Sequence, residues 1–247
     1  MKIFVSIDDT DNLESMGTGH LAARLISQIE EKGWGSSSFI TRHQLFVHPD
    51  VPYTSHNSAM CFQAELKDSS LAGLIDYAAS FLRQQSAPGS DPGLCIAICE
   101  MLKFPAEILD FGRGAKEQVL TKDAAYSLAA RLGIHLSEHG GTGGGVIGAL
   151  AGVGLRLSGN DGRIRGKIQL ENENGITKVA RVCSRPEVAS VQSLAGQTLA
   201  NEERIVLGEK VKTVLLDNKP VLLVAPLETP SNQACWRTCT KEELRIY

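Results

Sequence analysis

The stretch Ile7-Asp8-Asp9-Thr10-Asp11, followed by Met16-Gly17-Thr18-Gly19-His20, decides how the rest of the chain is organised. It comes directly after residues 2–6, an apolar run typical of a buried strand. Residues 21–29 then place apolar side chains at helical spacing. We therefore expect a strand, an acidic turn, a Gly-Thr-Gly loop and a helix, in that order.

The acidic turn carries three carboxylates within four residues, Asp8, Asp9 and Asp11. Like charges this close repel and raise each other's pKa, and a cation relieves the repulsion. Mg²⁺ prefers one or two carboxylates together with waters and substrate phosphates. We predict that Asp8, Asp9 and Asp11 are catalytic and hold Mg²⁺, with one of them available as a base. The alternative is a plain turn, because Asp often caps helices and forms turns.

The loop after the acidic turn has the chemistry of a phosphate site. Gly17 and Gly19 allow a ligand to approach the backbone closely, and a helix N-terminus attracts phosphate. Gly17, Gly19 and His20 are therefore predicted to bind the phosphate groups of a cofactor. Thr18 supplies the one hydroxyl of the loop, and we predict that it contacts or accepts a phosphoryl group.

A second glycine-rich stretch covers residues 139–150, where five of the six residues from 140 to 145 are glycine. It matches neither a P-loop nor a dinucleotide-binding fingerprint. It runs into an apolar segment, which favours a phosphate-binding loop over a flexible linker. We predict that Gly143, Gly144 and Gly145 offer backbone N–H groups to phosphate.

Four polar side chains, His20 again among them, are weaker candidates for substrate binding or charge stabilisation: His20, Arg42, His56 and Arg113. Arg113 lies between two glycines and is the best of them, so it is predicted to bind the cofactor. The alternative for each is a solvated surface side chain.

Composition sets broad limits. The chain has 247 residues, 43% of them hydrophobic and 21% charged, as in ordinary soluble proteins. A net charge of −3 gives no general attraction for nucleic acid. No apolar run reaches membrane length, so we expect a cytoplasmic protein with no membrane partner. The chain has six cysteines, and two of them, Cys235 and Cys239, could form half of a zinc site.

The order of the other patterns predicts an α+β fold with two lobes, a kinase-type α/β lobe and a ferredoxin-like lobe. We place the lobes at 1–115 and 116–247, with a ferredoxin-like part at about 60–132 that could be inserted. Thr121 should cap a helix that Gly133 ends. A tight hairpin turn is expected at Asp217-Asn218-Lys219. Short strands are expected at 164–170, 177–183, 204–207, 212–216 and 220–224.

Separated islands of this sequence resemble the N-terminal half of archaeal tRNA(Ile) agmatidine synthetase, in the same order. Three islands carry the resemblance: Ile7-Asp8-Asp9-Thr10-Asp11 with Met16-Gly17-Thr18, His48-Pro49-Asp50-Val51-Pro52-Tyr53-Thr54 with Asn57, and Gly143-Gly144-Gly145-Val146-Ile147-Gly148-Ala149-Leu150-Ala151. A fourth and weaker island is Thr198-Leu199-Ala200-Asn201.

The resemblance implies an ATP-dependent kinase-type domain beside a ferredoxin-like domain, with ATP and Mg²⁺ as cofactors. In the family, the Asp-rich motif handles Mg²⁺ and ATP, and a threonine in the next loop accepts phosphate. That threonine falls on Thr18, and the later glycine-rich loop falls on residues 143–148. A hydroxyl beside a metal-bound triphosphate suits phosphoryl transfer.

The sequence also departs from the family. Gly17-Thr18-Gly19-His20 stands where the family has Cys-Thr-Thr-Tyr, and residues 54–58 lack the family's Lys and Arg. Since phosphate contacts dominate nucleic-acid affinity, this loss weakens any claim on RNA. The chain ends before the family's OB-fold and zinc ribbon, so we expect no tRNA binding without a partner protein.

Together these observations favour a Mg-ATP-dependent phosphotransferase or ligase-like enzyme acting on a nucleoside, nucleotide or other small acceptor that remains unidentified. The alternatives are a catalytically degenerate nucleotide-binding module and an accessory subunit for RNA modification, and a homodimer is left open. Retention of three carboxylates and Thr18 favours the enzyme, because a binding-only site gains nothing from their repulsion.

Overall fold

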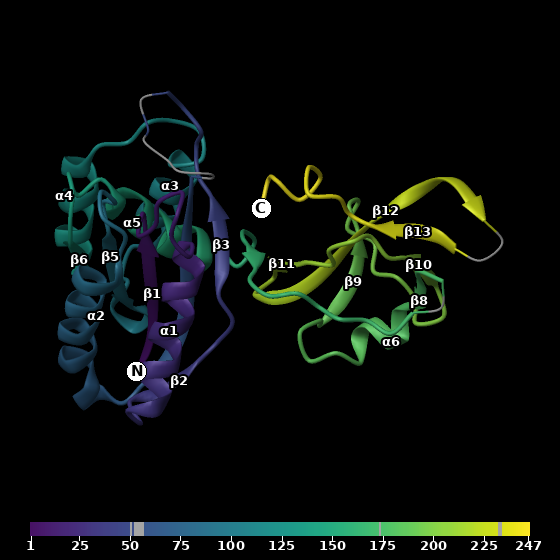
Figure 1. The fold of residues 1–247 in the computed structure, drawn as a ribbon, viewed down its shortest axis with the longest axis horizontal. Helices are drawn as coiled ribbons and strands as arrows, with labels where there is room; N and C mark the ends of the chain where they lie inside the picture. Colours follow the sequence, from purple (N-terminus) through teal and green to yellow (C-terminus); the bar gives the residue numbers. More distant parts are fainter. Residues whose placement is uncertain (50, 52–56, 173, 232–233) are drawn as a thin grey trace. The chain divides into compact units, whose positions relative to one another are not determined.

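The computed structural model describes residues 1–49, 51, 57–172, 174–231 and 234–247 (Figure 1). The chain is of the α+β class, as predicted, and its contacts divide it into two compact units, Met1–Ser158 and Gly159–Tyr247. The glycine-rich loop, which the sequence-based division placed in a lobe at 116–247, therefore lies in the first unit. No helix of the described part is long and apolar enough to cross a bilayer.

The first unit is built on an antiparallel sheet with the order β6-β5-β1-β4-β3, and β2 pairs with the same edge of β4 as β3 does. The acidic turn therefore follows a central strand, as the sequence predicted. Its strands are β1 (Lys2–Asp8), β2 (Gly35–Ser37), β3 (Thr41–Gln44), β4 (Ser58–Leu66), β5 (Gly93–Ile98) and β6 (His135–Glu138).

Helices cover both faces of this sheet (Figure 1). Alternation along β1 explains the arrangement: Ile3, Val5 and Ile7 belong to a core with α1 and α2, whereas Phe4 faces a core with α3, α4 and α5. The helices are α1 (Thr18–Glu31), α2 (Leu71–Gln85), α3 (Pro105–Gly114), α4 (Lys122–Leu132) and α5 (Gly145–Leu157), with 3-10 turns at Asp68–Ser70 and Cys99–Met101.

The chain order from β1 through α1, β2/β3, β4 and α2 to β5 is a βαββαβ unit covering residues 2–98. The range 60–132, which the sequence suggested for such a unit, holds only its second half. The strand and helix that the sequence predicts at 2–6 and 21–29 belong to its first half, but the predicted range did not assign them to this unit.

Helix α5 lies directly against the sheet because its small residues leave room for the strands. A Cβ on Gly148 would overlap the Asp8 carboxylate, and one on Gly152 would overlap Ser6 Oγ. A Cβ on Gly145 would overlap the carbonyl oxygen of Asp91. The glycines of this stretch therefore bring the helix close to the end of β1.

Two predicted boundaries are confirmed, and the best of the weaker candidate residues lies on a helix. Thr121 Oγ1 accepts a hydrogen bond from the Ala124 N–H at the start of α4, and Gly133 ends that helix with a φ of 67°. Arg113, predicted to bind the cofactor, lies between Gly112 and Gly114 in the last turn of α3. Gly112 is needed there because a Cβ would come within 2.9 Å of the Leu155 backbone nitrogen.

The second unit is mostly β-structure, with the order β7-β11-β12-β13-β10-β8 and with β9 parallel to β12. Asp217 and Asn218 both have positive φ, which confirms the tight hairpin turn between β11 and β12. Its elements are β7 (Arg163–Ile164), β8 (Ile176–Lys178), α6 (Val179–Cys183), β9 (Ser190–Ser193), β10 (Arg204–Val206), β11 (Thr213–Leu216), β12 (Lys219–Ser231) and β13 (Ala234–Thr238).

Two of the predicted strands in this unit are wrong in extent. Strand β7 is only two residues long, so most of 164–170 is not strand, and 179–183 forms the short helix α6. The α6 segment is rich in valine, whose strand preference depends on context and yielded here to tertiary packing. The unit's core gathers Val191, Ile205 and Leu222 around Val179 and Val182 of α6.

Candidate functional site

Asp8, the last residue of β1, begins the site. It is 8% exposed, and its side chain faces α5 at Gly148. Asp9 then turns the chain with a φ of 49°, a conformation that Asp tolerates better than most residues. The strand end and the glycine of α5 together hold one carboxyl inside the protein and place the next at its edge.

Thr18 is the first residue of α1 and is 5% exposed. Its Oγ1 donates to Asp11 Oδ1 at 3.2 Å and accepts from Thr10 Oγ1 at 3.1 Å. Gly17 precedes the helix, and a Cβ there would lie 3.4 Å from Asp11 Oδ2. The structure thus places the Thr18 hydroxyl beside a carboxylate of the acidic turn.

The carboxyl groups of Asp8 and Asp9 resist ionisation. Burial, followed by the charge of Asp9, raises the pKa of Asp8 from 3.8 to about 8. Burial, followed by the charge of Asp91, raises the pKa of Asp9 to about 6. Without a cation, Asp8 is therefore largely protonated at neutral pH.

These groups suit a divalent cation, because a bound cation would favour the charged form of each carboxyl. Within the described part of the chain, no group of three or more His, Cys, Asp or Glu side chains is arranged to hold a metal by itself. The arrangement therefore fits a cation held by one or two carboxylates plus a ligand's phosphate oxygens, as Mg²⁺ commonly is.

Asp91, in the turn before β5, joins the acidic turn to the glycine-rich loop. Its Oδ1 accepts the Thr142 backbone N–H at 2.6 Å, and its Oδ2 accepts the Thr142 hydroxyl. Its carbonyl accepts the Gly145 N–H at 3.1 Å. The same carboxylate raises the pKa of Asp9. Through Asp91, the Asp-rich turn and the glycine-rich loop become neighbours.

The glycine-rich loop uses most of its own backbone donors. Gly143 N–H donates to the Gly140 carbonyl at 3.2 Å, and Gly145 N–H is held by Asp91. Among the described residues, the Gly144 N–H has no protein acceptor. Of the three glycines predicted to bind phosphate, Gly144 is thus the one with a donor available in this conformation.

Lys122 and Glu138 brace the loop from its other side. Lys122 Nζ donates to the Thr142 carbonyl at 2.6 Å and forms an ion pair with Glu138. Gly143 has a φ of 76°, and a Cβ there would overlap the Glu138 carboxylate. Sequence reasoning missed Asp91, Lys122 and Glu138. The only signal in the sequence is the position of Asp91 in a stretch rich in Pro and Gly, which is typical of a plain turn.

The weaker candidates are spread over the unit. His20 is half-buried in the first turn of α1, beside buried Gly19, and so lies near Thr18. Arg42, in β3, donates to Ser58 Oγ at 2.9 Å. Arg113 is exposed on α3 and forms an ion pair with Asp110. His56, like residues 50 and 52–54 of the second resembling island, lies outside the described residues.

The cysteine pair near the C-terminus does not form a metal site by itself. Cys235 is exposed and Cys239 is buried, and burial raises the pKa of the Cys239 thiol to about 11. Among the described residues, no group of three or more His, Cys, Asp or Glu side chains that could hold a metal includes this pair.

Comparison with known proteins points to one group of enzymes, although no protein-family model matches the chain. The tRNA 2-agmatinylcytidine synthetase TiaS of Methanosarcina acetivorans is 26% identical over 160 residues, which make up 63% of this chain and 36% of that protein. The TiaS of Archaeoglobus fulgidus is 28% identical over 159 residues, or 64% of this chain and 36% of that protein.

Solved structures agree. The crystal structure of TiaS in complex with its tRNA and ATP is 28% identical, with a TM-score of 0.55 over 62% of this chain and 36% of that one. Apo TiaS has 28% identity and a TM-score of 0.54, with 62% of this chain and 35% of that one covered. This chain thus spans about a third of the length of the relatives it matches. Over about 160 residues, it is a distant homologue of the archaeal tRNA agmatidine synthetase TiaS.

Proposed function

We propose that this protein is a Mg-ATP-dependent phosphotransferase or ligase-like enzyme, acting on a nucleoside, nucleotide or other small acceptor. The observation that carries the proposal is the hydrogen bond from Thr18 Oγ1 to Asp11 at the start of α1. It joins a hydroxyl that could accept a phosphoryl group to a carboxylate that could take its proton. The ATP complexes described for TiaS support the choice of nucleotide.

Each part of the site has a role in this proposal. Asp8 and Asp9 would hold Mg²⁺ between the acidic turn and the phosphates. The bound cation would offset phosphate charge, which is much of what catalysis of phosphoryl transfer requires. Asp11 would accept the Thr18 proton, and the Gly144 N–H would donate to a phosphate oxygen. Gly17, Gly19 and His20 would border the phosphates at the start of α1.

We also propose roles for the parts of the first unit. The βαββαβ order of residues 2–98 supports a ferredoxin-like assignment for that part of the first unit. Because the Asp-rich turn and the glycine-rich loop both belong to the first unit, that unit would contain the whole ATP site. Arg113, paired with Asp110 on the surface, has less support as a ligand than the residues beside Asp91.

A second candidate function is a nucleotide-binding module without catalysis. The family's Lys and Arg are missing from residues 54–58, and this loss favours it. Fewer cations then remain to stabilise the charge of a phosphoryl group in transfer. In this case the protein would act as a subunit of an RNA-modification enzyme, alongside a partner that binds the RNA.

Mass spectrometry after incubation with Mg-ATP tests the first proposal. We expect one phosphate adduct on the wild-type protein, mapped to Thr18, and no adduct on Thr18→Ala or Asp9→Asn. Ser15→Ala is the matched control, since Ser15 is an exposed hydroxyl in the same loop and should leave the adduct in place. An adduct that persists in Thr18→Ala would overturn the role of Thr18. No adduct, with ATP still stabilising the fold, would favour the binding module.

A further inference from the structure

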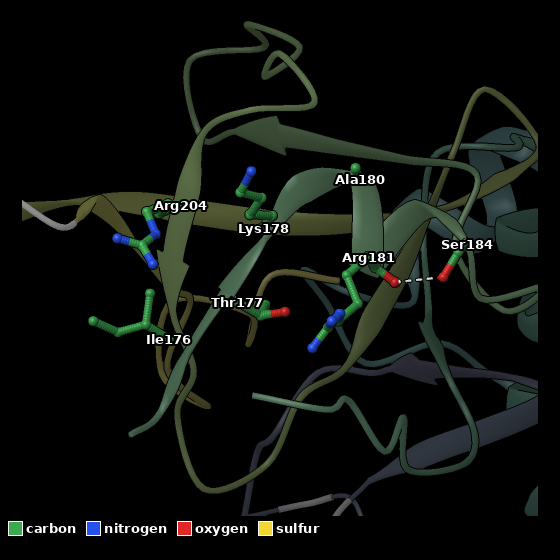
Figure 2. A pocket seen from close by; sticks show the side chains of 7 residues that line it. All are labelled: Ile176, Thr177, Lys178, Ala180, Arg181, Ser184 and Arg204. Carbon is green, nitrogen blue, oxygen red and sulfur yellow. Dashed lines mark hydrogen bonds between the residues drawn. The ribbon is translucent and has the colours of Figure 1, made fainter. Parts of the chain in front are cut away.

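The second unit contains a pocket that is separate in sequence from the Asp-rich and glycine-rich segments. Its volume is about 490 Å³, which is enough for a nucleotide-sized ligand. Figure 2 shows the side chains around it, which come from β8, α6 and β10 and from Ser184 just after α6. They are Ile176, Thr177, Lys178, Ala180, Arg181, Ser184 and Arg204.

The charge of this lining is one-sided. Lys178, Arg181 and Arg204 are cationic, and the other lining residues carry no charge. Lys178 and Arg204 are direct partners in the antiparallel pairing of β8 with β10. Like charges placed opposite each other across a strand pair are destabilising. An anion between them would remove that repulsion.

The carboxylates that now approach these cations are replaceable. Lys178 Nζ lies 2.9 Å from Glu202 and Arg181 lies 3.7 Å from Glu171, but those glutamates are 82% and 87% exposed. Exposed pairs of this kind contribute little to stability, about 0–1 kcal/mol. Arg204 has no ion-pair partner within the described part of the chain.

The other polar groups at the pocket already have partners. Thr177 Oγ1 donates to the Glu171 carbonyl at 3.1 Å, and Ser184 Oγ donates to the Arg181 carbonyl at 2.8 Å (Figure 2). The N–H groups of Val179 and Ala180 are bound to the carbonyls of Glu203 and Asn201. Recognition of a ligand therefore rests on the three cationic side chains.

We propose that this pocket binds the phosphate group of a ligand. Three cations outnumber the two exposed carboxylates of Glu171 and Glu202, which leaves a net positive charge. A phosphate monoester, with a charge of about −1.5 to −2 at neutral pH, would offset it. Each guanidinium group can also donate two parallel hydrogen bonds to phosphate oxygens. The phosphate could belong to a free nucleotide or to an RNA backbone, since both present the same oxygens to the cations.

The test measures binding to the full chain at low salt in EDTA, so that Mg-dependent binding at Asp8 and Asp9 does not contribute. The two probes are sodium tripolyphosphate, followed by calorimetry, and a short fluorescein-labelled single-stranded RNA, followed by anisotropy. Each of Lys178→Gln, Arg181→Gln and Arg204→Gln should weaken binding about three- to tenfold, and the triple variant should abolish it. Lys219→Gln, an exposed cation outside the pocket, is the matched control.

The outcomes separate the sources of the phosphate. Binding of both probes, lost together in the triple variant, supports a pocket for any accessible phosphate. Binding of RNA alone, with a weaker salt dependence in each single variant, supports a backbone contact. If neither probe binds the wild-type chain, or if the triple variant binds like Lys219→Gln, the proposal is wrong. None of these results depends on whether Thr18 is phosphorylated.

Discussion

At the residue scale, Asp8 is a buried carboxyl group whose proposed role, holding Mg²⁺, requires its charged form. Burial and the neighbouring Asp9 raise its pKa to about 8, above the 3.8 of an unfolded chain. The folded protein therefore holds this proton more tightly than the unfolded chain does. Its contribution to stability is complete below about pH 4 and is lost as the pH rises towards about 8. Asp9, with a pKa of about 6, acts in the same direction.

Asp8→Asn should remove the loss of stability that ionisation of Asp8 causes as the pH rises, because an amide does not ionise. In EDTA, we expect the variant to unfold at a higher temperature than the wild type at about pH 8, with the difference shrinking towards pH 4. With Mg-ATP the order should reverse at the higher pH, since only the carboxylate can hold the cation. Thermal unfolding across this pH range measures both effects.

Asp76→Asn, on the exposed side of α2, is the control for the Asp8 substitution. It reports what the same change does to a carboxylate outside the site. If Asp8→Asn and Asp76→Asn changed the pH dependence equally, burial of Asp8 would not explain the effect.

At the scale of single elements, α5 depends on glycines that a helix would otherwise avoid. Gly costs a helix about 0.5–1 kcal/mol relative to Ala, yet a Cβ on Gly148 would overlap the Asp8 carboxylate. Gly148→Ala should therefore destabilise the protein by about 1–3 kcal/mol, because the helix or Asp8 must move. It should also weaken stabilisation by Mg-ATP. Chemical denaturation with and without Mg-ATP measures the two effects.

Gly73→Ala in α2 is the matched control for Gly148→Ala. A Cβ on Gly73 would meet Trp34 at an ordinary distance of 3.5 Å. We therefore expect this substitution to leave stability unchanged or to raise it by up to about 1 kcal/mol. Equal effects of the two substitutions would mean that α5 does not rest on Asp8.

The elements also show what the sequence could predict. The start of α4 at Thr121, its end at Gly133 and the hairpin at Asp217-Asn218 were predictable because local backbone chemistry decides them. Helix α3 and helix α6 were not, because packing overrode local preference there. In the site, Thr18 and Asp11 are close in sequence and their contact was foreseeable. Asp91 and Thr142 meet from 51 residues apart, so only the fold brings them together.

At the scale of the whole molecule, each unit has a core of its own. The first unit buries clusters on both faces of its sheet, and the second buries separate clusters around Val191 and Val214. A compact unit with its own core can unfold as a cooperative unit. We therefore expect two transitions in calorimetry of the intact chain.

The ligands assign these transitions. Anything that binds only the folded form of a unit raises that unit's transition temperature. Mg-ATP should raise the transition temperature of residues 1–158 and leave that of residues 159–247 unchanged. Gly148→Ala should lower the transition temperature of residues 1–158. Tripolyphosphate in EDTA should raise the transition of residues 159–247, and the Lys178, Arg181 and Arg204 triple variant should not respond. A single transition that both ligands raise would contradict the independence of the units, because each site would then be stabilising one shared structure.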